Sequence, residues 1–104
     1  MTIRHIVLLP FKKSLLKQDI EQVMTAIGDL KKSIPQILSF SWGENNSIEH
    51  LEQGYFHGFV MEFKDEEARG IYLNHPEHVR VVQSRILPAL EGGAGSALVF
   101  DYYM

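Results

Sequence analysis

Cysteine is absent from the sequence, so disulfide bonds, thiolate metal sites and cysteine nucleophiles are all excluded. Long apolar runs are absent as well, because no stretch approaches the ~18–20 apolar residues that span a bilayer. The opening residues carry no signal-peptide pattern, since the apolar run at residues 6–10 is short and no cleavage site follows it. We therefore expect a cytoplasmic protein with no membrane partner.

Positive charge is scarce too. The chain has 10 lysine and arginine residues against 13 aspartate and glutamate residues, which gives a formal net charge of −3. A nucleic-acid backbone requires clustered basic side chains, and the only basic pairs are Lys12-Lys13 and Lys31-Lys32. Both pairs fall at the ends of predicted elements, where they are expected to be solvated. The composition therefore predicts no nucleic-acid partner.

Sequence signatures of cofactor binding are also missing. The glycine-rich stretch at residues 92–95 precedes a predicted strand, whereas a phosphate-cradling loop leads into a helix. No nucleophile elbow is present. We expect no cofactor.

What the chain does contain fits one domain that spans residues 1–104. Hydrophobic residues make up 45% of it, as in an ordinary globular domain, and the charged fraction of 22% is too low for disorder. Ser14 is predicted to cap a long helix, which ends at Pro35. Asp65 is predicted to cap a short helix, and Pro76 is expected to begin a third helix. Hydrophobic periodicity predicts strands at residues 3–11, 37–43, 55–63 and 97–103, and helices at residues 14–34, 66–73 and 76–90.

The element order βαββαβ predicts an α+β, ferredoxin-like fold. Right-handed crossovers place both helical connections on one face of a four-stranded antiparallel sheet. Several strands are nevertheless apolar on both faces, so the uncovered face would expose Ile6, Leu8, Phe56 and Val60. Such a patch is larger than monomers usually tolerate. We expect a homodimer through the sheet face, which forms a dimeric α/β barrel.

Two histidines fall on the apolar strand face that is expected to meet the helices. His5 shares its face with Leu9, and His57 shares its face with Phe59 and Met61. A buried polar group without a partner costs ~1–3 kcal/mol, so these rings predict either a polar network or a ligand site. A ligand there would also meet the apolar stripe of the first helix at Val23, Met24 and Ile27.

His78 and Tyr72 are the candidate chemical groups outside the strands. His78 stands at about the third helical position after Pro76, where unpaired N–H groups and the helix dipole disfavour an imidazolium. A neutral imidazole suits a general base. Tyr72 ends the preceding helix and could donate its hydroxyl to a developing enolate. For both residues, plain packing of one ring on the other remains the alternative.

A metal site is the weaker alternative for these histidines. His75-x-x-His78 with His5 or His57 would supply three imidazoles, as zinc sites use. Pro76 lies between the first two, so they do not share one regular helical face, and no carboxylate stands at ligand spacing. We expect no metal, and we expect His50 to lie on the surface of a polar loop.

Several motifs resemble the stress-responsive A/B barrel domain (Dabb) family. They lie at residues 4–12, 41–43, 54–55, 72–79 and 99–102, and the most specific is Tyr72…His75-Pro76-x-His78. The resemblance covers nearly the whole chain, and it implies a ferredoxin-like fold and a dimeric α/β barrel.

Within that family the chain resembles a plant polyketide cyclase at His5, His57, Tyr72 and His78. The resemblance implies an intramolecular aldol condensation in which His78 is the base and Tyr72 binds the carbonyl, with His57 and His5 nearby. The cyclase lines its pocket with aromatic residues where this chain has aliphatic ones, so no substrate identity is implied.

Three hypotheses follow. The first is a cofactor-free cyclase or lyase-type enzyme that acts on a small apolar carbonyl compound. A pocket of ~300 Å³ or more between sheet and helices supports it, and a closed, filled core excludes it. The second is a non-enzymatic, stress-associated dimer or assembly protein in which the same residues only pack. The third, on fold analogy alone, is a heme- or oxygen-dependent monooxygenase.

Overall fold

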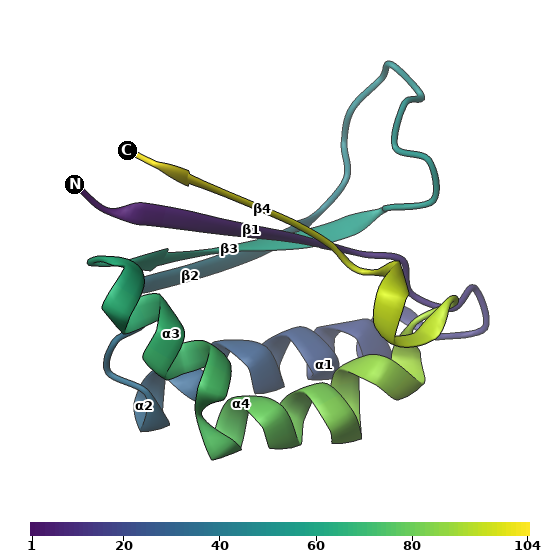
Figure 1. Cartoon of the computed structure of the whole chain (residues 1–104). Helices are drawn as coiled ribbons and strands as arrows, with labels where there is room; N and C mark the ends of the chain where they lie inside the picture. Colours follow the sequence, from purple (N-terminus) through teal and green to yellow (C-terminus); the bar gives the residue numbers. More distant parts are fainter.

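Four strands form one sheet, and every helix lies on the same face of it (Figure 1). The computed structural model describes all residues, 1–104. The elements are β1 (Ile3–Leu9), α1 (Lys17–Gly28), α2 (Leu30–Ser33), β2 (Ser39–Glu44), β3 (His57–Phe63), α3 (Glu66–Asn74), α4 (Pro76–Val81) and β4 (Leu98–Tyr103). Short helical segments follow α4: the π-helix η1 (Val82–Ile86), the 3-10 helix η2 (Leu87–Ala89) and the 3-10 helix η3 (Gly93–Ser96).

The sheet has the strand order β2-β3-β1-β4, and all neighbours are antiparallel. The ferredoxin-like βαββαβ fold expected from the sequence is confirmed. The central strand β1 pairs with both β3 and β4, so that His5 lies opposite Met61 on one side and Asp101 on the other. Residues that lie opposite one another share a face, and these three therefore point to the same side of the sheet.

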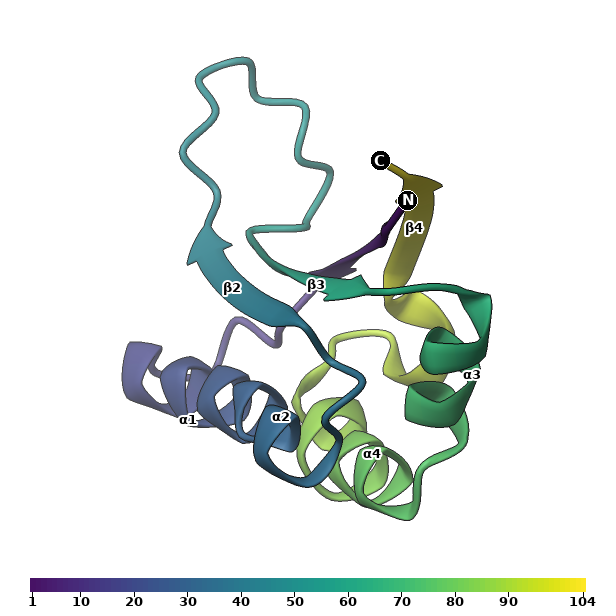
Figure 2. The ribbon, with the colours of Figure 1, turned by 90° about the vertical axis from the view of Figure 1, so that its left-hand side faces the viewer.

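The side chains of β1 alternate between the two faces as its sequence predicts. Ile3, His5, Val7 and Leu9 are buried, and the residues between them are only half-buried. The buried row belongs to the hydrophobic core, and Figure 2 shows the layer of helices on one side of the sheet. A cluster of 18 buried hydrophobic residues fills the space between the sheet and the helices.

The first helix differs from its prediction at both ends. Its N-cap is Leu16, not Ser14, and the side chain of Asp19 accepts the Leu16 N–H at 2.9 Å. Leu16 is exposed, although the stripe pattern included it, because it precedes the first helical turn. The helix also breaks at Asp29, which divides it into α1 and the single turn of α2.

The second helical region begins as predicted. Asp65 caps α3 by accepting the Ala68 N–H at 2.9 Å, and Pro76 occupies the first turn of α4. The predicted stripe is wrong at Val79, which is exposed, whereas Val81 is buried. The wider π-helical turn of η1 shifts the helix phase after this point.

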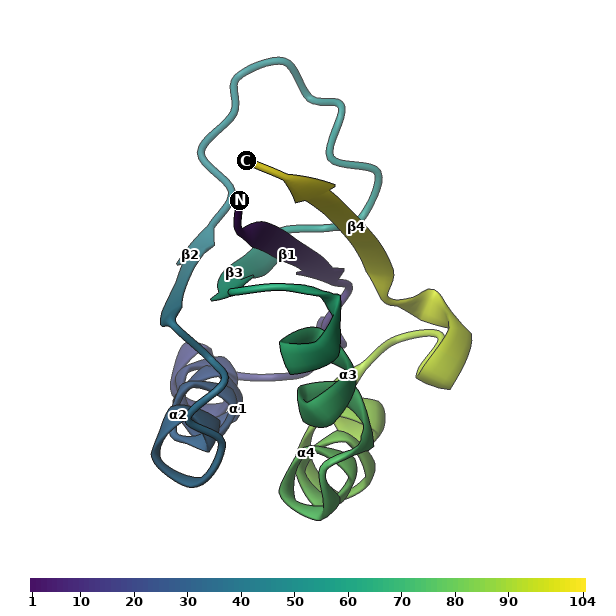
Figure 3. The same cartoon turned by 60° about the vertical axis from the view of Figure 1, so that its left-hand side comes forward.

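The opposite face of the sheet carries no helix. The loop of residues 45–56 between β2 and β3 rises on that open side, away from the helices (Figure 3). This loop contains bends and turns and no helical turn. None of the helices has the length and apolar character that a membrane span would require.

Candidate functional site

A cavity of about 260 Å³ lies between the sheet and the helical segments α3, α4, η1 and η2. Twelve of its 15 lining residues are hydrophobic. The other three are His5, His78 and Asp101, which come from β1, α4 and β4. An apolar cavity with a few convergent polar groups is the usual form of a small-molecule site. Its volume is slightly below the ~300 Å³ named for the enzyme hypothesis, but the space is not the closed, filled core that excludes that hypothesis.

Tyr72 and His78 are in direct contact at this cavity. Their ring centroids are 4.2 Å apart with an angle of 43° between the planes. The break at His75, between α3 and α4, turns the chain so that the two side chains meet. His78 Nδ1 lies 3.1 Å from the carbonyl oxygen of Leu73. A carbonyl only accepts hydrogen bonds, so Nδ1–H is the donor.

Burial sets the protonation state of His78. Desolvation lowers the pKa of this imidazole, and the positive charges that His5 and His75 can carry lower it further. The hydrogen bond to Leu73 opposes this shift in part. The ring is therefore neutral at physiological pH, as expected from its place near a helix start, but the largest cause is burial.

Tyr72 is almost fully buried, with 2% of its surface exposed. Burial raises the pKa of its hydroxyl above the ordinary value, so the group stays protonated. The hydroxyl has no hydrogen-bond partner in the protein, although the ring packs on Phe63 and His5. A protonated, unpaired hydroxyl at a cavity wall is available to a bound molecule.

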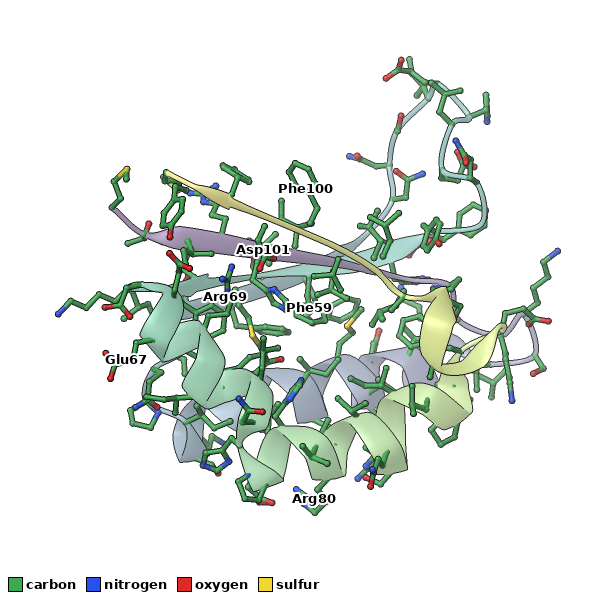
Figure 4. All side chains as sticks on the ribbon, in the orientation of Figure 1. Phe59, Glu67, Arg69, Arg80, Phe100 and Asp101 are labelled. Carbon is green, nitrogen blue, oxygen red and sulfur yellow. The ribbon has the colours of Figure 1, made fainter.

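His5 is held by a carboxylate and, through it, by a guanidinium. Its Nδ1 lies 2.7 Å from Asp101 Oδ1, and Arg69 Nη1 donates to Asp101 Oδ2 at 3.0 Å. Figure 4 shows Arg69 and Asp101 beside one another between α3 and β4, and Phe59 directed from the sheet toward the helices. Phe59 and Tyr72 flank the His5 ring, with centroids 6.3 and 5.9 Å away.

His57 does not join this group, which corrects the expectation that it lies nearby. It pairs with Leu9 at the far end of β3 from Met61, four residues along β1 from His5. At ~3.4 Å per residue the separation along the strand is about 14 Å. Its ring packs instead on Phe11, with centroids 5.4 Å apart.

The apolar residues predicted to meet a ligand divide into two sets. Leu9 and Phe59 line the cavity. Val23, Met24, Ile27 and Met61 do not line it, because they are fully packed in the hydrophobic core. The sequence stripe marked these four as inward-facing, but it did not distinguish filled core from cavity wall.

His75 has a structural role in the fold. It caps α4, and its Nδ1 accepts the backbone N–H of Glu77 at 3.1 Å. No group of three or more His, Cys, Asp or Glu side chains is arranged to hold a metal ion.

Asp101 and Arg69 are the site residues that the sequence did not single out. A signal for Asp101 was present, because it is the one charged residue in the inward-facing row of the last strand, between Val99 and Tyr103. A carboxylate in such a row needs a partner. Arg69 lacked any comparable signal, since arginine on a short helix is usually solvated.

A wider groove of about 570 Å³ lies on the open side of the sheet, beneath the loop of residues 45–56. Only 4 of its 12 lining residues are hydrophobic, and it does not include His5, Tyr72 or His78. His57 lines this groove and not the cavity. The smaller cavity is the better candidate site because the groups with shifted pKa values converge there.

Comparison with known proteins places this geometry in a family. Residues 3–104 match the model of the family described as "Stress Responsive A/B Barrel Domain". The stress-response A/B barrel domain-containing protein HS1 of Arabidopsis thaliana is 33% identical over 100 residues, which cover 96% of this chain and 87% of HS1. Olivetolic acid cyclase of Cannabis sativa is 28% identical over 79 residues, which cover 76% of this chain and 78% of the cyclase.

Solved structures show the same fold. The crystal structure of At3g17210 from Arabidopsis thaliana has a TM-score of 0.89 at 33% identity and covers 98% of this chain and 94% of its own. A dimeric ferredoxin-like protein of unknown function from Jannaschia sp. has a TM-score of 0.85 at 26% identity and covers 100% of both chains. Hydroxynitrile lyase from Passiflora edulis, at 22% identity and a TM-score of 0.86, shares the fold over 99% of this chain and 93% of its own.

Proposed function

We propose that the chain, which belongs to the stress responsive A/B barrel domain (Dabb) family, binds a small apolar carbonyl compound in its cavity and transfers a proton from it to His78. The observation that carries the proposal is the contact of a neutral histidine with a protonated, unpaired tyrosine at an apolar wall. The similarity to olivetolic acid cyclase supports the same class of chemistry.

The roles follow from the hydrogen bonds. Because Nδ1 of His78 carries its proton toward Leu73, Nε2 holds the free lone pair. We assign Nε2 as the base that removes a proton from the carbon next to a carbonyl group. The electron pair of that C–H bond moves to the carbonyl oxygen, which becomes an enolate.

Tyr72 stabilises the charge that forms on this oxygen. Its hydroxyl donates a hydrogen bond to the enolate, and the low exposure of the ring keeps competing water away. In a cyclase reaction the enolate carbon then attacks a second carbonyl of the same molecule, and the oxygen of that carbonyl takes the proton back from His78 Nε2 to become a hydroxyl. In simple exchange the carbon itself regains a proton from His78 Nε2. Base and hydrogen-bond donor are both side chains of this chain, so we propose that the step needs no cofactor.

Proton exchange in D₂O tests this proposal without knowledge of the natural substrate. We expect the wild-type protein to exchange the protons next to the carbonyl of benzylacetone, acetophenone or benzoylacetone faster than buffer does. His78→Gln should lower that rate by about 10²–10⁴-fold because it removes the base, and Tyr72→Phe by about 10²–10³-fold.

His50→Asn is the matched control, since His50 is exposed and has a positive φ that asparagine tolerates. It should exchange like the wild type. If the wild type exchanges none of the three ketones faster than His78→Gln does, the enzymatic proposal is wrong and the non-enzymatic alternative stands.

We further propose that the chain works as a homodimer through the open face of the sheet. Phe100 and Leu98 of β4 lie on this face and are 59% and 42% exposed, next to Ile6 and Leu8 of β1. Figure 4 shows Phe100 directed away from the helices. The Jannaschia protein of the same fold is described as dimeric. The cytoplasmic location expected from the sequence stays a prediction.

A further inference from the structure

We infer that the polar end of the cavity accepts hydrogen bonds from its ligand, so that it selects neutral hydroxyl or enol compounds over carboxylates. The inference rests on the proposed function only for its location, since it concerns the same cavity. It is carried by three atoms that have no partner in the protein: His5 Nε2, His78 Nε2 and the Tyr72 hydroxyl. The only fully buried side-chain polar atoms without partners are Arg4 Nε and Glu52 Oε2, so these three atoms are accessible to a small molecule in the cavity.

The Leu73 carbonyl fixes the tautomer of His78. The carbonyl oxygen of Leu73 lies 3.1 Å from Nδ1 and can only accept a hydrogen bond. A neutral imidazole ring carries a single proton on one of its two nitrogens. The proton is therefore on Nδ1. Nε2 is left as a hydrogen-bond acceptor at the cavity.

Asp101 fixes the tautomer of His5 in the same sense. Arg69 donates to Asp101 Oδ2 at 3.0 Å, and Oδ1, a carboxylate oxygen, accepts from His5 Nδ1–H at 2.7 Å. This geometry places a proton of His5 on Nδ1. In the tautomer with that single proton, Nε2 is another acceptor at the cavity.

The cavity thus offers two imidazole acceptors and one hydroxyl that can donate or accept, inside a wall of which 12 of 15 residues are hydrophobic. A ligand hydroxyl or enol O–H satisfies an imidazole acceptor, whereas an ether oxygen leaves it unpaired. A carboxylate would bring its negative charge toward two lone pairs and toward Asp101, which also lines the cavity. The pattern of acceptors therefore points to neutral O–H donors.

Nitrogen NMR of the histidine side chains tests the tautomers without any ligand. We expect His5 and His78 to carry the proton on Nδ1. His75 is a control within the same spectrum, because its Nδ1 accepts the Glu77 N–H and its proton must be on Nε2. Protonation of Nε2 in either His5 or His78 at neutral pH would overturn the inference.

Three probes with the same apolar body test the selectivity. We expect the wild-type protein to bind para-propylphenol about 10–100-fold more tightly than para-propylanisole, which lacks the donor. Binding of para-propylbenzoate should be weaker than that of the anisole. The double variant His5→Leu/His78→Leu should remove most of the difference between phenol and anisole, whereas His50→Asn should keep it.

The result is separable from the outcome of the exchange experiment. Phenol selectivity with the expected tautomers, but without proton exchange, upholds the inference and refutes the catalysis. Proton exchange with equal binding of the phenol and the anisole upholds the proposed catalysis and refutes the inference on ligand selectivity. Preference for the benzoate over the phenol would refute the inference directly.

Discussion

His5 and Asp101 are 96 residues apart in the sequence, yet the imidazole Nδ1 and the carboxylate Oδ1 are 2.7 Å apart. They lie opposite one another in the adjacent strands β1 and β4. Arg69 of α3 binds the other carboxylate oxygen. This network therefore links the edge strand to the centre of the sheet and to the helix that carries Tyr72.

Replacement of Asp101 by asparagine should destabilise the fold. The change removes the charge that both His5 and Arg69 use, and hydrogen bonds to charged groups contribute about 1.5–3 kcal/mol. We expect the free energy of unfolding in urea to fall by about that amount. The control is Glu77→Gln, which breaks an exposed pair with Arg80 and should leave the midpoint unchanged. Equal losses in the two variants would contradict a special role for Asp101.

The strand faces were predictable because their pattern has a period of two. His5 and Phe59 lie on the side that simple alternation assigns to them. The face on which a side chain lies, however, does not determine how far along the strand it is from another residue. The resemblance implied that His57 lies near His78, and the inward face that it shares with Phe59 agreed with this, but the pairing of His57 with Leu9 places it at the other end.

The helix phases were less predictable because they depend on local backbone geometry. Asp19 caps the first helix from inside its first turn, so Leu16 and not Ser14 became the N-cap. The π-helix of η1 inserts an extra residue into the second helical region. No periodicity of 3.6 anticipates that insertion, which is why Val79 was assigned to the core in place of Val81.

The stability of the fold should fall on acidification, and His78 should account for part of the fall. Burial lowers its pKa below the ordinary value of 6.5, so the unfolded chain takes up the proton more readily. The contribution of His78 to stability is thus present above about pH 6.5 and is lost as the pH falls toward its lowered pKa. Urea unfolding at about pH 7.5 and about pH 5 measures this slope.

The comparison with His78→Asn separates this contribution from those of the other histidines. The wild type should lose more stability than the variant between the two pH values. An identical loss in both proteins would mean that His78 does not titrate with a lowered pKa.

Core and cavity residues should respond differently to truncation. Ile27 is fully buried away from the cavity, so Ile27→Ala should cost about 2–5 kcal/mol of stability and leave binding of para-propylphenol unchanged once the protein is folded. Ile86 lines the cavity and is only partly buried. Ile86→Ala should cost less stability but enlarge the cavity, so that a longer alkylphenol binds relatively better. Calorimetry of both phenols with both variants checks the distinction.

The proposed dimer makes the open sheet face the most sensitive surface of the molecule. Phe100→Glu places a charge in the middle of the apolar row, where a second copy would have to bury it without a partner. We expect the wild type to sediment at twice the chain mass and Phe100→Glu to sediment as a monomer. Glu67→Lys, on the outer surface of α3 (Figure 4), should remain dimeric. A wild-type protein that stays monomeric at micromolar concentration would show that the apolar row of β1 and β4 needs no partner.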